Sequence, residues 1–310
     1  MNLRHLAFLI ALERERHFGR AAASCHVTQP TLSGALRQLE DELGVPIVER
    51  NRRRFIGFTP EGAQILEWAR IIVADCEGLR QDLDALRGGL KGRLRLGAIP
   101  AAMPVVSLVT APFCRRNPGV SVTLPSLTSI EIQAGLETYR LDAGLTYLDN
   151  EPLKGVRSVP LYRERYVLLT PEGGLFDGRR TVAWREAATL PLCLLNPDMQ
   201  NRRILDRLFA GAGAQPRVRI DTSSFMAIHA HVRFGGWSTI LPHTFLYLLG
   251  EVAGMRRIPL TEPDASQGVG LVVPDRDPQG PVVDALIKEI RRSRIAAAIE
   301  GLVGGGAAGV

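Results

Sequence analysis

The sequence predicts an α/β protein in three parts: a small N-terminal winged helix-turn-helix, a long helix suited to pairing, and a larger α/β region. Three observations support this division. Short helical patterns and a basic turn occupy residues 1–59, and apolar residues at alternating three- and four-residue steps occupy residues 60–91. Strand and helix patterns then alternate from 92 to 300, which is typical of a sheet covered by helices. We expect a disordered, glycine-rich tail over 301–310.

The composition is that of a globular protein. The chain has 310 residues, of which 45% are hydrophobic and 23% charged, with a net charge of +6 that is compatible with a polyanionic partner. Its four cysteines lie far apart, which argues against a disulfide framework or a zinc site and fits a reducing cytosol. The apolar N-terminus is interrupted by Glu13 and Glu15, and no run of about 18 apolar residues occurs. We therefore expect a cytoplasmic protein that neither carries a signal peptide nor spans a membrane.

The helix predicted over residues 27–44 has a clear start and an apolar face. Thr28 can cap it, and Pro30 lies in the first turn, where a missing N–H is harmless. One face of this helix carries the apolar side chains Leu32, Ala35, Leu36, Leu39 and Leu43. A first helical stripe near residues 3–10 and a short alanine-rich helix at 19–25 precede it. The three elements together predict a helix-turn-helix.

The opposite face of the same helix carries neutral hydrogen-bonding groups and a cation. Its candidate DNA-contacting residues are Thr28, Gln29, Pro30, Thr31, Ser33, Gly34 and Arg37. An amphipathic helix of this kind also occurs as an ordinary solvated element, so the flanking elements decide the interpretation. His26, in the turn before the helix, is expected to be solvated rather than to bind a metal.

Residues 45–62, VPIVERNRRRFIGFTPEG, predict a wing. Val45, Ile47 and Val48 are expected in the core, and residues 55–58 are expected to form a returning strand. The turn between them carries four arginines, Arg50, Arg52, Arg53 and Arg54. A solvated basic loop is the alternative, but beside a helix-turn-helix such a cluster is positioned to contact phosphates.

The helix predicted from Pro60 to about residue 90 carries a heptad seam. The seam consists of Ile65, Ala69, Ile72, Cys76, Leu79, Leu83, Leu86 and Leu90. Packing against the chain's own body is the alternative, but a repeat near 3.5 residues favours a partner helix. The sequence therefore predicts a dimerising linker helix that ends in a glycine-rich joint.

The larger region alternates strands and helices. Strands are predicted at residues 93–98, 120–124, 141–148, 166–170, 192–195, 218–220 and 268–273. Helices are predicted at residues 101–117, from 128 onward, and at 181–188, 198–210, 223–234 and 281–299. This alternation predicts a parallel sheet with helices on its faces.

The run AAASCHVTQPTLSGALRQLEDELGVPIVER, followed by FTPEG and a long helix, resembles the LysR-type family of bacterial transcriptional regulators. The resemblance covers the whole chain. It implies a winged helix-turn-helix DNA-binding domain at 1–59, a linker helix at 60–91 and a periplasmic-binding-protein-like effector domain at 92–300. It also implies two lobes, the first over about 92–161 and 268–300 and the second over about 162–267.

The family further implies homodimers or homotetramers that bind double-stranded promoter DNA, with RNA polymerase as a further partner. Residues matching Gln29, Thr31 and Ser33 face the major groove in the family. The next position is Gly34 here, where the family usually carries a longer side chain. Gly34 therefore removes one base contact.

A ligand in such a fold lies where helix N-termini meet the carboxyl ends of strands. The candidate effector-binding residues are Ile99, Pro100, Ala101, Ser126, Thr128, Ser129, Thr146, Asn196, Gln200, Thr222 and Ser223. Each group also has a structural alternative, since Thr128 with Glu131 forms a capping box and Ser223 can cap its own helix. Residues 98–103 match the family's first effector loop but lack its usual hydroxyl.

Hydroxyls and free N–H groups around one cleft favour a small anionic effector, most simply a carboxylate. The segments SLTSIEIQAGLETYRLDAGLTYLDNEPL and LCLLNPDMQNRR resemble regulators that accompany formate dehydrogenase operons. That resemblance implies formate as the effector.

Two other classes of protein fit the sequence less well. An enzyme would need a nucleophile elbow, a phosphate loop or a metal cluster, and the sequence shows none of these patterns. His229 and His231 do not share a helix face. A solute-binding transport protein would explain only the C-terminal half. We predict a sequence-specific, effector-modulated regulator without catalytic residues, cofactor or metal.

Overall fold

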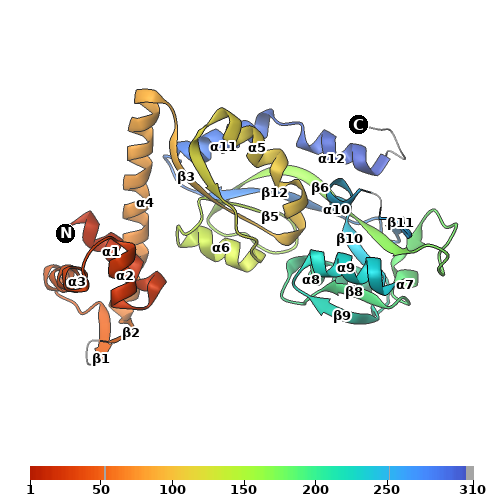
Figure 1. Ribbon diagram of the computed structural model, residues 1–310, viewed down its shortest axis with the longest axis horizontal. Coiled ribbons are helices and arrows are strands. Elements are labelled where there is room, and N and C mark those ends of the chain that lie inside the picture. The colour runs from red at the N-terminus through yellow and green to blue at the C-terminus, as the bar shows by residue number, and fades with distance from the viewer. Residues whose placement is uncertain (52–53, 251, 305–310) are drawn as a thin grey trace. The chain divides into compact units, whose positions relative to one another are not determined.

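The computed structural model describes residues 1–51, 54–250 and 252–304, which form two compact units (Figure 1). The smaller unit spans Met1–Leu90, and the larger begins at Lys91. No helix in the described ranges is long and apolar enough to cross a membrane.

The smaller unit has the order expected of a winged helix-turn-helix. Its elements are α1 (Leu3–Glu15), α2 (Phe18–Ser24), α3 (Gln29–Leu43), β1 (Val48–Asn51), β2 (Arg54–Phe58) and α4 (Pro60–Gly88). Strands β1 and β2 pair antiparallel, as predicted for the wing. Arg52 and Arg53 lie outside the described residues.

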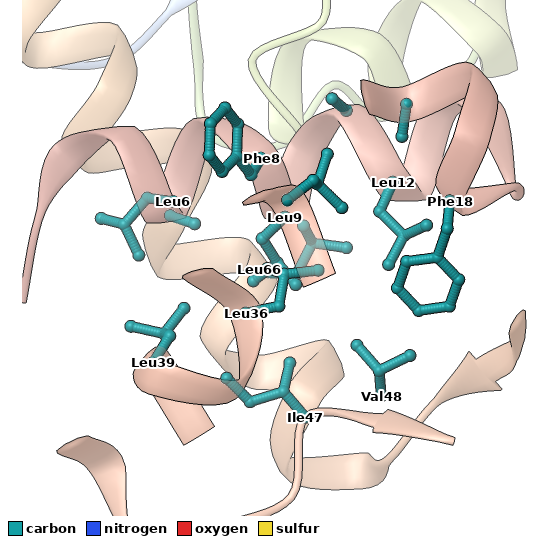
Figure 2. Packing of buried hydrophobic residues seen from close by; sticks show 14 of the residues in the cluster. Leu6, Phe8, Leu9, Leu12, Phe18, Leu36, Leu39, Ile47, Val48 and Leu66 are labelled. Atoms are coloured by element: carbon teal, nitrogen blue, oxygen red, sulfur yellow. The ribbon is translucent and has the colours of Figure 1, made fainter. Parts of the chain in front are cut away.

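The core of the smaller unit joins the three short helices to the wing and the start of α4. Figure 2 shows Leu9 and Leu12 of α1 packing with Leu36 of α3, Ile47 and Leu66. All five side chains are buried, so removing any of them from the apolar interior would leave a cavity. Leu43, predicted on the apolar stripe, is 40% exposed, because the stripe leaves the core before α3 ends.

The ends of α3 and α4 are fixed by caps. The Thr28 hydroxyl accepts a hydrogen bond from Thr31 N at 3.4 Å, and Gly44 ends α3 at a φ of 70°. Thr59 caps α4 by accepting from Gly62 N at 2.9 Å, while its hydroxyl donates to Pro46 O at 2.6 Å. The FTPEG segment thus joins wing and helix.

Helix α4 has two different halves. Ile65, Ala69 and Ile72 pack against the core of the smaller unit, so the first half of the predicted seam contacts the chain's own body. Leu79, Leu83 and Leu86 are 61%, 45% and 84% exposed. Only this second half is left without an intramolecular partner among the described residues.

The larger unit contains the remaining elements. Its strands are β3 (Lys91–Ala98), β4 (Gly119–Thr123), β5 (Ala143–Tyr147), β6 (Val156–Pro171), β7 (Val182–Ala183), β8 (Leu192–Leu195), β9 (Val218–Thr222), β10 (Thr239–Pro242), β11 (Met255–Thr261) and β12 (Ser266–Pro274). Its helices are η1 (Pro100–Val105), α5 (Val106–Arg116), α6 (Ser129–Glu137), α7 (Trp184–Ala187), α8 (Gln200–Gly211), α9 (Phe225–Gly235), α10 (Phe245–Leu249), α11 (Pro281–Arg292) and α12 (Ile295–Gly304).

Strand β6 runs through both halves of the larger unit. It pairs with β12 as far as Arg165 and with β10 from Tyr166 onward. The main sheet has the order β4-β3-β5-β12-β6-β11-β7, and β8 and β9 form a separate parallel pair contacted by α8 and α9 (Figure 1). One continuous strand thus links two groups of strands.

Several predictions about the larger unit were wrong in detail. The sheet is mixed rather than parallel, because β12 pairs antiparallel with both β5 and β6. The helix predicted over 281–299 is divided into α11 and α12. Helix α12 reaches Gly304, so residues 301–304 of the predicted disordered tail are helical, while 305–310 lie outside the described residues.

Candidate functional site

The outward face of α3 carries the predicted DNA-contacting residues. Gln29, Thr31 and Arg37 are exposed and Ser33 is half-buried, while Leu32, Leu36 and Leu39 on the other face are buried. Thr28 and Pro30 hold the first turn, with the Thr28 and Thr31 hydroxyls 2.8 Å apart. The face therefore offers donors and acceptors at its N-terminal half, where a helix entering a major groove presents its side chains.

Gly34 leaves a gap in this face. A Cβ built at Gly34 has no heavy atom within 4 Å, so a larger side chain would fit without a clash. The glycine is consequently not required by packing. Its effect is confined to the exposed surface.

Arg50 was predicted to offer its charge to DNA phosphates, but in the structure its guanidinium contacts residues of its own unit. Its guanidinium donates to Glu40 Oε2 at 2.9 Å and lies over the Phe18 ring, 5.6 Å from its centroid. Glu40 Oε1 also accepts from the N–H groups of Ile47 and Val48, each at 3.0 Å. Arg50 thus braces the base of the wing rather than offering a free cation, because its charge is already paired with Glu40.

A pocket in the larger unit collects six of the predicted effector-binding residues: Ile99, Pro100, Ala101, Thr128, Ser129 and Gln200. Four further residues that we did not predict line it: Tyr147, Leu195, Met199 and Asn201. About 220 Å³ of empty space lies in the pocket and its opening, a volume that includes open solvent, so the pocket suits only a very small ligand. The ten lining residues include no charged side chain.

The polar groups of the pocket come from the starts of two helices. Helix α8 begins at Gln200 without a side-chain cap, so its first N–H groups lack an intrahelical partner. Gln200 is 4% exposed, and its Oε1 has no hydrogen-bond partner among the described residues. A buried amide of this kind is satisfied by a ligand or water.

Other predicted residues lie elsewhere in the described part of the chain. Ser126, Thr146, Asn196, Thr222 and Ser223 are not among the residues that line this pocket. The cap of α9 is Ser224, which accepts from Ala227 N, and not Ser223, which precedes it. Thr128 lines the pocket and also forms the capping box with Glu131.

A buried hydrogen-bond chain lies directly behind the pocket lining. Asn201 Nδ2 donates to the Tyr147 hydroxyl at 3.0 Å, and that hydroxyl donates to Glu164 Oε1 at 2.5 Å. Glu164 is fully buried on β6, and burial raises the pKa of its carboxyl to about 8, an effect that the Tyr147 hydroxyl only partly offsets. Glu164 therefore carries a proton at neutral pH.

Sequence reasoning missed this chain because its members lie 17 and 54 residues apart along the sequence. Tyr147 ends β5, Glu164 belongs to β6, and Asn201 lies in the first turn of α8. The local signal was the alternation of β6 at this point, where Glu164 shares a strand face with Tyr162 and Tyr166 while Arg163 and Arg165 are exposed.

No group of three or more metal-ligating side chains occurs within residues 1–51, 54–250 and 252–304. His231 Nδ1 instead lies 2.8 Å from Ala227 O in its own helix.

A winged helix-turn-helix and a two-part α/β unit with an internal pocket together define a ligand-responsive DNA-binding regulator. Residues 3–63 match the model of the bacterial regulatory helix-turn-helix protein, lysR family, and residues 87–294 match the LysR substrate binding domain. The chain belongs to the LysR family, which consists of transcriptional regulators and not enzymes.

Known proteins are similar to this chain over nearly its whole length. The DNA-binding transcriptional dual regulator OxyR of Escherichia coli K12 is 30% identical over 292 residues, covering 94% of this chain and 95% of OxyR. A full-length OxyR cysteine-to-aspartate variant from Pseudomonas aeruginosa has a TM-score of 0.77 at 26% identity, covering 96% of this chain and 99% of that one. CbnR in complex with its target DNA shares the fold, with a TM-score of 0.65, 22% identity and coverage of 94% and 99%.

These comparisons do not support the predicted resemblance to regulators of formate dehydrogenase operons. Curated relatives are named as OxyR and as hydrogen peroxide-inducible genes activators. One of the activators, from Pectobacterium carotovorum, is 30% identical over 273 residues, which are 88% of this chain and 90% of its own length.

Proposed function

We propose that the exposed face of α3 reads promoter DNA in the major groove while the wing contacts the flanking phosphates. The observation that supports this proposal most directly is that Gln29, Thr31 and Arg37 are exposed on one face of α3, while the opposite face buries Leu32, Leu36 and Leu39. Arg52, Arg53 and Arg54 supply the cationic part of the wing, whereas Arg50 supports it through Glu40.

Gel-shift titration with DNA from upstream of the protein's own gene tests this proposal. Binding should weaken steeply as salt increases, because counterions are released from each neutralised phosphate. Replacing Arg52, Arg53 and Arg54 by alanine should weaken binding to all sequences and flatten the salt dependence by about one unit of slope for each lost phosphate contact. Absence of binding, or a salt slope that the triple variant leaves unchanged, would contradict the proposal.

We further propose that the pocket binds a small carboxylate as the effector, with formate as the simplest candidate. The pocket is small and has free N–H groups at the start of α8 and the hydroxyl of Ser129, while the Thr128 hydroxyl is engaged with Glu131. Such a set of donors favours an anion. Binding would draw together the β5 and α6 side and the α8 side of the pocket, and would thereby alter the arrangement of two bound copies on DNA.

Hydrogen peroxide is the alternative effector that the names of the relatives suggest. The cysteines of this chain do not favour a thiol switch at the pocket. None of the ten lining residues is a cysteine, and Cys193 is fully buried, where burial raises the pKa of its thiol to about 11. A thiolate, which is the species that peroxide oxidises, is therefore scarce at Cys193 near neutral pH.

A thermal-shift screen distinguishes the two effectors. Formate, acetate and larger carboxylates would be titrated against the purified full-length protein, with hydrogen peroxide in a parallel series. Saturable stabilisation by a small carboxylate supports the proposal, since a ligand that binds only the folded state raises its stability. If hydrogen peroxide alone changes the melting temperature and no carboxylate does, peroxide and not a carboxylate is the effector.

We also propose that the protein acts as a homodimer or homotetramer. The exposed leucines of the second half of α4 form one face of a helix that extends beyond the core of its own unit. A second copy of the same face would cover them.

A further inference from the structure

Within one helical turn of the pocket-lining residues Gln200 and Asn201, α8 carries an arginine in a geometry suited to a carboxylate. Arg203 of α8 donates from Nε to Glu151 Oε1 at 2.9 Å and from Nη2 to Glu151 Oε2 at 3.0 Å. This is the two-pronged arrangement in which guanidinium groups bind carboxylates most specifically. Arg203 follows Gln200 and Asn201, both of which line the pocket, by less than one helical turn.

The guanidinium of Arg203 is held in place independently of Glu151. Its Nη1 donates to the carbonyl oxygen of Asp198 at 2.6 Å, and the Pro197 carbonyl lies 3.4 Å away. These carbonyls belong to the segment just before α8. The Nε and Nη2 edge therefore stays directed at the same place when Glu151 moves away.

Glu151 comes from the segment of residues 148–155 between β5 and β6, and not from α8. Its Oε2 lies 3.4 Å from the hydroxyl of Ser129, a residue that lines the pocket. The carboxylate is thus shared between Ser129 and Arg203. It shows where a carboxylate from a ligand would be bound.

The ten lining residues provide no positive charge, and Arg203 is a cation linked to them through Glu151 and Ser129. We propose that Arg203 is the residue that binds the carboxylate of the effector, and that Glu151 occupies the same guanidinium edge as an internal competitor until the effector displaces it. This proposal rests on the proposed carboxylate effector and names the residues that select for its charge.

The proposed competition between Glu151 and the effector predicts whether each substitution raises or lowers the affinity for the effector. The effector and Glu151 need the same two donors, so neutralising Glu151 should strengthen effector binding. Both side chains of the pair are a little over one quarter exposed, at 28% for Arg203 and 27% for Glu151, so the competition is partly screened by solvent. We expect a change of about 3- to 10-fold in the dissociation constant, the range that about 1 kcal/mol of ion-pair energy allows.

Isothermal titration calorimetry of the full-length protein with sodium formate and sodium acetate tests this proposal. Glu151→Gln should bind the better of the two anions 3- to 10-fold more tightly than the unaltered protein. Arg203→Gln should bind it at least 10-fold more weakly, and Arg203→Lys should recover only part of this loss because lysine lacks the planar pair of donors. Asp275→Asn serves as the control, because it removes one charge from an exposed pair with Arg157 that shares no residue with the pocket.

The outcomes separate the two proposals. If the unaltered protein binds a carboxylate but Glu151→Gln binds no more tightly, or Arg203→Gln binds equally well, the role of this pair is overturned while the proposed effector stands. If neither the unaltered protein nor Glu151→Gln binds either anion, both proposals are overturned. In that case Arg203 fails to bind a carboxylate even when Glu151 no longer competes for its guanidinium. Gel-shift titration of the same variants with DNA checks that the smaller unit is intact.

Discussion

Two glycines of the DNA-binding unit have opposite surroundings. A Cβ built at Gly62 would overlap the carbonyl oxygen of Ile47, whereas one built at Gly34 meets nothing within 4 Å. Gly62 is therefore required by the close approach of α4 to the residue before β1. Gly34 is not required by the fold.

Exchanging each glycine for alanine should consequently change stability in opposite directions. Gly62→Ala should lower the free energy of unfolding by about 1 to 3 kcal/mol, because the backbone at Ile47 must move to admit a methyl group. Gly34→Ala should raise it by up to about 1 kcal/mol, since alanine is the better helix former at an exposed helical position. Urea unfolding followed by circular dichroism measures both, and equal effects of the two substitutions would contradict the contact at Ile47.

The buried carboxyl of Glu164 makes stability depend on pH. Its pKa is raised from an ordinary value near 4.5 to about 8, so between these pH values the folded protein holds a proton that the unfolded chain releases. The stability that the neutral carboxyl allows is complete below about pH 4.5 and is lost as the pH rises through about 8. Glutamine at this position would remain neutral throughout.

Glu164→Gln should therefore flatten the fall in melting temperature between pH 5 and pH 9. The melting temperatures of the unaltered protein and of the variant would be compared across this range in one buffer series. The unaltered protein should lose more stability toward high pH than the variant does. Parallel curves would show that Glu164 is already ionised in the folded protein.

The sequence could identify many single residues correctly where their role is local. Thr28, Pro30 and the Thr128 capping box all act within three or four residues of their own position, so their spacing predicts them. Arg50 could not be placed in this way, because the partner of its guanidinium is Glu40, ten residues away in the preceding helix. Arg203 and Glu151 are 52 residues apart and meet only in the folded unit.

Among the elements, α4 carries the clearest prediction about assembly. Its first half is covered by the core of its own unit, and its second half exposes Leu79, Leu83 and Leu86. Leu79→Glu combined with Leu83→Glu should separate the proposed dimer, because carboxylates opposite one another in a helix pair repel and resist burial. Sedimentation velocity at a fixed concentration measures the change in mass.

The matched control for this experiment is Gln81→Glu. Gln81 lies about half a turn from the leucine face, so it adds a carboxylate to the same helix without disturbing the seam. Dissociation by the control as well, or a dimer that survives both leucine substitutions, would show that α4 does not provide the interface.

Elements with strong local periodicity were predicted well, and those without it were not. The helices of the smaller unit and strands β3, β4 and β8 lie close to the predicted ranges. The first half of β6, VRSVPLYRER, contains a proline and four charged residues, so only its apolar second half was recognised. Strand β10 and helix α10 were missed because each is short. Strand β11, MRRIPLT, was missed because two arginines and a proline interrupt its apolar pattern.

At the scale of the whole molecule, the order of the parts along the chain was predictable, and the pairing of strands within the larger unit was not. The resemblance rests on a contiguous motif, so the succession of DNA-binding unit, linker helix and α/β unit follows from the sequence. The pairing of strands across the larger unit depends on contacts between residues far apart in the sequence, such as Val272 of β12 paired with Gly144 of β5. Contacts of this range determine a mixed rather than a parallel sheet and cannot be derived from periodicity.

Two copies bound through their α3 helices should contact successive major grooves. Footprinting upstream of the protein's own gene should therefore reveal protected half-sites on one face of the DNA, roughly 34 Å or a multiple of that apart. Addition of a small carboxylate should change the length or the spacing of the protected region. A single protected half-site, unchanged by any carboxylate, would contradict both the paired arrangement and the proposed effector.

The uncovered leucines of α4 also have a consequence for how the regulator responds to its own abundance. If only paired copies read a complete operator, the concentration of the active form rises with the square of the concentration of the chain while most chains are single. Doubling the amount of protein then increases operator occupancy up to about fourfold at low expression. The exposed side chains of one helix thereby set a threshold in gene dosage, below which the operator remains almost empty.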